Sequence, residues 1–456
     1  MRRVVKVSRI RIIITIIVVV LTTLLTGCTG KEPNEIAYVV ALGIDSTDDD
    51  NYKITIQYAN TTQISGGASE SGGKAGSEIV DNVTIEAPNI YAGVGLANNI
   101  VSKSFSMSHA KLIVFSKEVA EKGVKDMIET LVRSEEIRPD VFIAVANTTA
   151  NDYLTSVNPE MEVNPAQYYQ LIYQKNQLVG IPDGQLREFF TGLYTDNYDS
   201  ILPVAGVIEG AGGNSQNDDK GQSKDSQNEG SEGSSESLDS FESKSSNEKD
   251  ENEKEKDAEK NTSKYEYDIK NYVGGETAIE KKNKAEAIGA AVFEKDKMVG
   301  ELGEVETEIC KMLKGDYTYS YLTYYNNDTP DIPITVKTTQ QKKPKYKIDT
   351  DKKTVDIELY IESDLYSLPA DYNVENKIED FERDVANYTS SACTEFINNF
   401  TKKYNSDILK LNEKVKYKFL TNNQYNWFKK NVGWSEYKFS VCTNFKVRRT
   451  GLIVRE

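Results

Sequence analysis

Alternating apolar and polar positions predict β-strands in both halves of the chain. Residues 52–58 and 354–362 place apolar side chains at every second position, which is the pattern of a strand with one buried face. Residues 36–45 are almost uniformly apolar, so they predict a buried strand that forms an antiparallel hairpin with 52–58. Shorter apolar runs predict further strands at 80–85, 111–115, 141–146, 287–293, 298–302, 332–336 and 437–447.

Apolar residues at spacings of three and four predict helices between these strands. The clearest case is 373–404, which reads as a long amphipathic helix. Residues 117–133 predict one continuous helix, with Ser116 as its N-cap. Two more helices are predicted, one at 304–313 and one that Pro88 opens.

Together these elements predict an α+β fold of two to three domains, each with a mainly antiparallel sheet flanked by helices. The succession of strand, helix and strand in the first half is also compatible with an α/β domain. The predicted divisions are a signal peptide at 1–27, a tether at 28–35, an N-terminal domain at 36–208, an acidic linker at 209–284, a middle segment or small domain at 285–330, and a C-terminal domain at 331–456.

The linker differs in composition from the rest of the chain. Residues 209–264 consist mostly of Ser, Asn, Gly, Glu, Asp and Lys, and their acidic side chains outnumber the lysines by about eight. Such a segment cannot bury enough apolar surface to offset the entropy lost on ordering, so we expect it to be disordered. The simplest interpretation is a solvated insertion without a specific role.

The N-terminal segment predicts a lipoprotein signal. Five cationic residues among the first eleven precede an apolar run at 12–25. A secretory signal core needs roughly 7–15 apolar residues, whereas a membrane-spanning helix needs about 20. The run ends in Thr26-Gly27-Cys28, which resembles a bacterial lipobox and predicts cleavage before Cys28 and lipidation of its thiol, detectable with labelled palmitate. An uncleaved signal anchor with an incidental cysteine is the alternative.

The net charge limits the possible binding partners, and the number and spacing of the cysteines limit the possible disulfide and metal sites. A net charge of −16 argues against a nucleic-acid partner, and an anionic membrane surface would repel the body, so the lipid would supply the anchoring. Lipidation of Cys28 leaves Cys310, Cys393 and Cys442, an odd number with no C-x-x-C spacing. Buried free cysteines are the favoured interpretation, and one disulfide with a spare thiol remains open.

No motif predicts a catalytic residue, a metal site or a cofactor. The single histidine, His109, has no ligand or nucleophile at a suitable spacing and suggests a structural or recognition role at a strand edge. The glycine-rich loop at 66–74 lacks the first glycine and the Ser/Thr of a phosphate loop. Trp427 and Trp434 could line a sugar or partner groove, although core packing is the simpler interpretation.

Four stretches occur in an order that matches a known family. They are NEIAYVVALGID at 34–45, SHAKLIVF at 108–115 with IRPD at 137–140, GAAVF at 289–293 with MVGEL at 298–302, and VRRTG at 447–451. With the preceding lipobox they resemble the Ger(x)C family of spore-germination lipoproteins, the C subunits of nutrient-germinant receptors. The chain departs from the family at 29–32, where Thr-Gly-Lys-Glu replaces a Trp-Asp-Arg-like stretch, and in its long insertion at 209–264.

The resemblance implies a non-catalytic lipoprotein subunit on the outer face of the spore inner membrane. Its partners would be a membrane-embedded A-type subunit and a transporter-like B-type subunit, and its only functional residue carried over from the family would be the lipidated Cys28. The fold implied is three α+β domains. A solute-binding lipoprotein with a ligand cleft is the alternative, and the abundant carboxylates leave a wall hydrolase open as a third possibility.

Overall fold

The computed structural model describes residues 13–18, 35–49, 51–59, 80–157, 164–174, 180–195, 197–208, 271–277, 283–326, 329–367, 377–404 and 406–449. Cys28, the loop at 66–74 and most of the acidic linker lie outside these residues. Residues 13–18 are helical. Within the described ranges, no helix combines the length and the apolar character needed to cross a bilayer.

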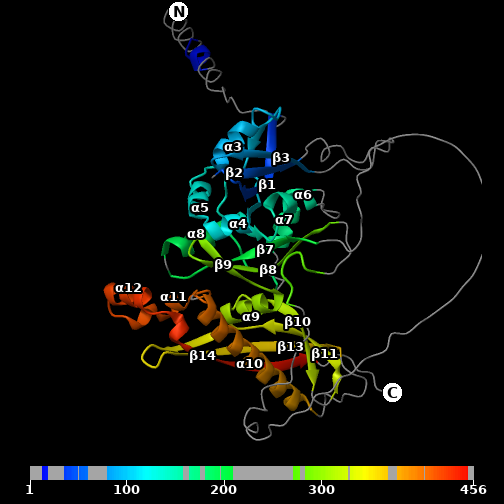
Figure 1. Cartoon of the computed structure of the whole chain (residues 1–456), viewed down its shortest axis with the longest axis vertical. Coiled ribbons are helices and arrows are strands. Elements are labelled where there is room, and N and C mark those ends of the chain that lie inside the picture. Colours follow the sequence, from blue (N-terminus) through cyan, green and yellow to red (C-terminus); the bar gives the residue numbers. More distant parts are fainter. Residues whose placement is uncertain are drawn as a thin grey trace, which may run out of the picture. The chain divides into compact units, whose positions relative to one another are not determined.

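Strands between residues 36 and 302 build a nine-stranded sheet in the order β3-β2-β1-β5-β6-β7-β8-β9, with β4 paired to β1 (Figure 1). Its strands are β1 (Ile36–Ser46), β2 (Tyr52–Ala59), β3 (Val80–Ala87), β4 (Ser104–Ser106), β5 (Leu112–Ser116), β6 (Phe142–Ala146), β7 (Ile201–Val207), β8 (Ala285–Glu294) and β9 (Lys297–Leu302). The predicted hairpin is confirmed, because β1 and β2 pair antiparallel with Ile44 opposite Ile54.

The centre of this sheet is parallel, so the predicted mainly antiparallel pairing holds only toward its two ends. Strands β1, β5, β6 and β7 run in the same direction, whereas β2, β3, β8 and β9 join by antiparallel pairing. Parallel neighbours need crossover connections, and helical segments supply them between β5 and β6 and between β6 and β7. The α+β class is therefore confirmed, with a mixed first sheet.

Helices cover both faces of the first sheet, which explains why β1 is apolar throughout. They are α3 (Ile90–Ala97), α4 (Lys117–Lys122), α5 (Lys125–Val132), α6 (Ala150–Ser156), α7 (Pro165–Gln174) and α8 (Leu186–Thr195). Leu42 and Ile44 of β1 pack into one buried cluster with residues of α3, α4 and α5, whereas Val40 and Ala41 pack into another with residues of α6 and α7. A strand buried on both faces reads as a continuous apolar run.

The helix predicted at 117–133 is two helices, because the chain breaks at Gly123. Ser116 caps α4 as expected, its hydroxyl accepting a hydrogen bond from the backbone N–H of Val119. Gly123 then adopts a φ of +121°, which a side chain would disfavour, and Val124 donates its backbone N–H to the carbonyl of Asp296. This contact with the turn between β8 and β9 redirects the chain before α5 begins.

The second half builds a five-stranded sheet in the order β10-β11-β13-β12, with β14 paired to β13. Its strands are β10 (Tyr319–Asn326), β11 (Thr329–Gln340), β12 (Lys345–Asp349), β13 (Thr354–Ser367) and β14 (Lys438–Arg449). All pairs are antiparallel except β13 with β14. The predicted segment 285–330 contributes β8 and β9 to the first sheet and β10 to the second.

Helices pack on one face of the second sheet. They are α9 (Glu304–Lys314), α10 (Ile378–Tyr404), α11 (Leu411–Val415) and α12 (Asn422–Asn431), with short 3₁₀ turns η2 (Lys416–Lys418) and η3 (Trp434–Glu436). The long predicted helix is confirmed from Ile378 onward, and residues 373–376 lie outside the described part. It forms the crossover that lets β14 return parallel to β13, and Figure 1 shows it lying across the sheet.

Candidate functional site

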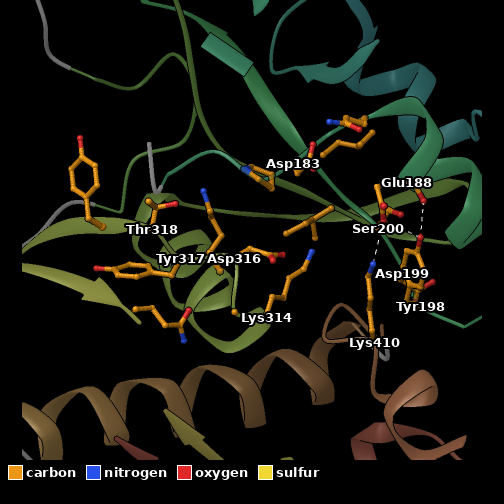
Figure 2. A pocket seen from close by; sticks show the side chains of 18 of the residues that line it. Asp183, Glu188, Tyr198, Asp199, Ser200, Lys314, Asp316, Tyr317, Thr318 and Lys410 are labelled. Carbon is orange, nitrogen blue, oxygen red and sulfur yellow. Dashed lines mark hydrogen bonds and ion pairs between the residues drawn. The ribbon is translucent and has the colours of Figure 1, made fainter. Parts of the chain in front are cut away.

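A charged cavity of about 680 Å³ lies where the segment around α8 meets α9 and the second sheet (Figure 2). One wall comes from 182–202, which includes the start of α8 and the start of β7. The opposite wall comes from the end of α9, from β10 and from β11. Its charged lining residues are Asp183, Glu188, Asp199, Lys311, Lys314, Asp316, Lys337 and Lys410.

The end of α9 places two lysines and an aspartate at this cavity. The helix stops at Gly315, whose φ of +82° is the left-handed conformation that glycine adopts most readily. The backbone N–H groups of Gly315 and Asp316 both donate to the carbonyl of Lys311 at 3.0 Å. Lys311 and Lys314 therefore occupy the last helical turn, with Asp316 just beyond it.

Lys311 is the most buried charged group of the cavity, with 5% of its surface exposed. Its Nζ donates to the carbonyl of Ile181 at 3.0 Å. Burial lowers the pKa of Lys311 to about 8, while Asp316 and Asp183 favour its charged form. Its contact with the segment before α8 fixes one side of the cavity.

Glu188, Tyr198 and Lys410 form a linked group at the other side. Lys410 Nζ lies 3.2 Å from Glu188 Oε2 and 4.2 Å from the centre of the Tyr198 ring. The Tyr198 hydroxyl donates to the backbone carbonyl of Glu188 at 3.0 Å. Burial favours the neutral form of Glu188, but attraction to Lys410 and hydrogen bonds from Lys410 and Tyr198 leave its pKa below the usual value. Figure 2 shows Lys410 reaching toward Glu188 across the cavity.

Asp199 and Asp407 join the two halves of the fold behind this group. The backbone N–H of Asp407 donates to Asp199 Oδ2 at 2.8 Å, and that of Asp199 donates to the carbonyl of Asp407 at 3.1 Å. The buried Asp407 carboxylate accepts from the backbone N–H groups of Leu411 and Asn412, each at 2.8 Å. Burial raises the pKa of Asp407 to about 7 despite these hydrogen bonds.

The arrangement suits the binding of a small charged molecule. The cavity offers ammonium donors and carboxylate acceptors within a volume typical of small-molecule sites. Within this lining, Lys410 forms an ion pair with Glu188. Among the residues that the structure describes, no group of three His, Cys, Asp or Glu side chains is placed to hold a metal ion.

The residues singled out by sequence lie elsewhere. His109 sits between β4 and β5, where its Nδ1 lies 3.0 Å from the Ser108 hydroxyl and its ring meets Tyr38 edge-on. Cys310, Cys393 and Cys442 are free, which confirms the favoured interpretation, although Cys442 is exposed and only the other two are buried. Burial raises the thiol pKa to about 11 in Cys310 and about 12 in Cys393, which makes them inert.

The two tryptophans differ in their exposure to solvent. Trp434 is 4% exposed and packs in the core of the second half, as predicted. Trp427 is 64% exposed, so core packing is the wrong interpretation for this residue. The helix α12 buries Tyr425 and Phe428, and Trp427 lies on the face that turns away from them.

The sequence alone does not predict this cavity, because its walls lie far apart in the chain. Asp183 and Lys410, for example, are separated by the whole acidic linker and by ten of the described strands and helices. The one local signal is Lys314-Gly315-Asp316, where a glycine after a helical pattern predicts a helix end flanked by charges.

Comparisons with known proteins match both halves of the fold. Residues 30–207 match the family model described as spore germination protein N-terminal domain, and residues 288–451 match the one described as spore germination B3/GerAC like, C-terminal. The two matches leave out the acidic linker and together span most of the chain.

Individual relatives agree with these matches. The chain is 26% identical over 174 residues to spore germination protein KC of Bacillus subtilis (strain 168), covering 35% of this chain and 42% of that one. It is 28% identical over 145 residues to the putative spore germination protein YfkR of the same organism, covering 32% and 37%. The chain thus spans about two fifths of the length of these curated relatives.

A solved structure is also similar. The crystal structure of the GerBC protein aligns with 89% of this chain and 96% of its own, with a TM-score of 0.47 and 15% sequence identity. On the two domain matches, in the order in which the family carries them, the chain belongs to the GerAC-like family of spore germination proteins that its sequence motifs resemble.

Proposed function

We propose that this chain is the non-catalytic lipoprotein subunit of a nutrient germinant receptor. In this proposal Cys28 carries the lipid, and the domains contact the membrane-embedded A-type and B-type subunits at the outer face of the spore inner membrane. The observation that carries the proposal is the pair of family matches, one on each side of the linker.

The fold is consistent with a role in protein contacts. Polar contacts such as those of Asp199 with Asp407 link its two halves, so surfaces from both halves are available to partner proteins. The short tether at 28–35 would keep that body near the membrane, since eight extended residues reach about 28 Å at most. A lipidated cysteine with two or more acyl chains gives stable anchoring, whereas one chain is marginal.

Co-purification from spore membranes with a tagged chain tests this function. We expect A-type and B-type subunits to accompany the wild-type chain, and the variant Cys28→Ala to lose palmitate labelling and most of its membrane partners. The variant Cys442→Ala, which changes an exposed cysteine of β14, is the matched control and should behave as wild type. Unchanged labelling of Cys28→Ala would rule out the lipid site, and recovery of neither membrane subunit with the wild-type chain would count against the receptor role.

A second candidate function, binding of a small charged solute, is favoured by the cavity beside α9. The site presents Lys314 and Lys337 together with Asp183 and Asp316 around one volume, as a zwitterion such as a free amino acid would require. A ligand at one hundred times its Kd stabilises the folded state by about 2.7 kcal/mol. If this function is correct, at least one amino acid of a panel tested at such a concentration should therefore raise the melting temperature of the protein.

The variant Lys314→Gln should abolish that stabilisation, and Lys122→Gln, on the exposed surface of α4, should leave it intact. Absence of any shift across the panel would remove solute binding from consideration and would leave the receptor proposal untouched.

A further inference from the structure

The segment around α12 exposes large apolar side chains among lysines. Tyr417 is 78% exposed, Leu420 is 95% exposed and Trp427 is 64% exposed, which are unusually high values for residues of this size. An exposed lysine lies within three residues of each of them in the sequence. We define the α12 patch as Lys416, Tyr417, Lys418, Leu420, Trp427 and Lys430.

Packing beneath the patch holds these side chains outward. Thr421 caps α12, its hydroxyl accepting from the backbone N–H of Gln424 at 3.3 Å. Tyr425 and Phe428 turn inward, and their rings lie 5.9 Å and 4.9 Å from the ring of Phe419. Because the buried stripe uses these positions, Trp427 faces away from the core.

The charge of this segment is opposite to that of the whole chain. Residues 410–430 contain six lysines and a single carboxylate, Glu413, within a chain of net charge −16. Lys410 pairs with Glu188, and Lys429 donates to the carbonyl of Thr195 at 3.2 Å, so these two are committed to the fold. The lysines of the α12 patch are exposed, although Lys418 also reaches the carbonyl of Ile348.

We propose that the α12 patch docks on an anionic lipid surface. Trp, Tyr and Lys together are the side chains that favour the boundary between lipid headgroups and acyl chains, where the rings enter the interface and the ammonium groups meet phosphates. Leu420 supplies an aliphatic side chain that can enter the acyl region. An acidic protein could also meet the lysines, but it would need a separate pocket for each protruding side chain, whereas a bilayer accommodates them without one.

Docking of this kind refines the expectation that an anionic membrane repels the body. Net charge acts at long range and is screened within about 8 Å at physiological ionic strength, so a local basic patch can bind where it lies closest to the surface. The patch would give the body one preferred orientation on the bilayer. The inference goes beyond the proposed receptor function, and it does not require the lipid at Cys28.

The full-length lipidated chain, added to preformed vesicles, provides the test. The chain has two tryptophans, and Trp434 is buried, so any change in environment on docking comes from Trp427. In vesicles that contain phosphatidylglycerol we expect Trp427 emission to shift to shorter wavelength and to be quenched by brominated acyl chains. In vesicles of pure phosphatidylcholine we expect neither effect, although the chain still floats with the vesicles through its anchor.

Matched variants distinguish an effect of the lysines in the α12 patch from an effect of the net charge of the protein. The double variant Lys416→Gln/Lys430→Gln should lower the docked-to-undocked ratio about five-fold for each lysine removed. The double variant Lys122→Gln/Lys125→Gln removes the same charge from exposed positions of α4 and α5 and should leave that ratio unchanged. In Trp427→Phe the signal should vanish, which identifies the reporter.

Three outcomes would overturn the proposal: equal quenching in both kinds of vesicle, no quenching in either, or an equal loss in the control pair. If the patch variants instead lose the membrane subunits in co-purification while Trp427 never responds to phosphatidylglycerol, the occupant is an acidic protein surface and lipid docking is wrong. Flotation reports the anchor separately, so failure of the lipid site at Cys28 and failure of the patch give different results.

Discussion

Replacement of Gly206 by alanine is expected to lower the free energy of unfolding by about 3 kcal/mol, the upper range for a forced steric overlap. A Cβ at Gly206 of β7 would lie 2.0 Å from the backbone carbon of Gly274 and 2.1 Å from the backbone nitrogen of Gly275. Both neighbours are backbone atoms, which cannot move aside as a flexible side chain can.

The backbone at 274–275 is itself held in place. The N–H of Gly274 donates to the carbonyl of Ile288 at 2.9 Å, and Gly275 has a φ of +96°. The carboxylate of Glu286, which is buried, accepts from the backbone N–H of Gly275 and from the hydroxyl of Thr277. These contacts hold the backbone at 274–275 against β7. Displacing this backbone would therefore also disturb the pairing of β7 with β8.

Gly95→Ala is the matched control for this prediction. Gly95 lies inside α3, where a Cβ would meet nothing within 4 Å. Alanine in a helix interior is more favourable than glycine by roughly 0.5–1 kcal/mol, so this variant should be slightly more stable than wild type. Urea unfolding of the three proteins compares them directly, and similar midpoints for Gly206→Ala and wild type would contradict the close approach at β7.

Sequence periodicity located the strands and the long helix because each is decided by local burial. The uniform apolar run of β1 and the alternation in β13 both follow from which faces are covered. The direction of strand pairing is a different matter. It depends on where each crossover returns the chain, which is why the parallel centre of the first sheet was not predicted from strands such as β5 and β6 alone.

Two local signals were present in the sequence and carried more information than periodicity alone suggested. Gly123 lies within an apolar helical stripe and marks the break between α4 and α5, where the backbone N–H of Val124 donates to the carbonyl of Asp296. In the same way, Trp427 and Trp434 look equivalent in sequence. The spacing of Tyr425 and Phe428 identifies the buried face of α12 and so separates Trp427 from it. For the cavity beside α9 the sequence marks only the helix end at Lys314-Gly315-Asp316, because long-range packing alone brings Glu188 to Lys410.

Stability is expected to fall as pH rises from 5 to 8, and Asp407 is expected to be a main cause. The carboxyl of Asp407 has a pKa of about 7 in the folded protein, against about 3.9 when unfolded. A raised pKa means that the folded state holds the proton more tightly. The contribution of this group to stability is therefore complete below about pH 4 and is lost as pH rises toward 7. The nearby carboxylate of Asp199 adds to the effect, and Lys414 opposes it.

Asp407→Asn should remove this dependence, since an amide does not titrate. Between pH 5 and pH 8 the wild-type free energy of unfolding should fall by about 2–3 kcal/mol more than that of the variant, which is the linkage expected for such a shift. Urea titrations at the two pH values measure both slopes, so a uniform loss of stability in the variant, from its poorer acceptance of the two backbone N–H groups, does not obscure the result.

Asp349→Asn tests whether the effect comes from burial. Asp349 accepts backbone N–H groups of Asp351 and Lys352 at 3.1 Å and 2.9 Å, much as Asp407 accepts those of Leu411 and Asn412. It lies near the surface, however, and the hydrogen bond from Lys352 lowers its pKa. Its contribution to stability is present above pH 4 and is lost only in acid, so Asp349→Asn should leave the slope between pH 5 and pH 8 unchanged. Equal slopes in wild type and Asp407→Asn would instead show that the joint between the two halves of the fold tolerates a charged Asp407, and that water reaches it.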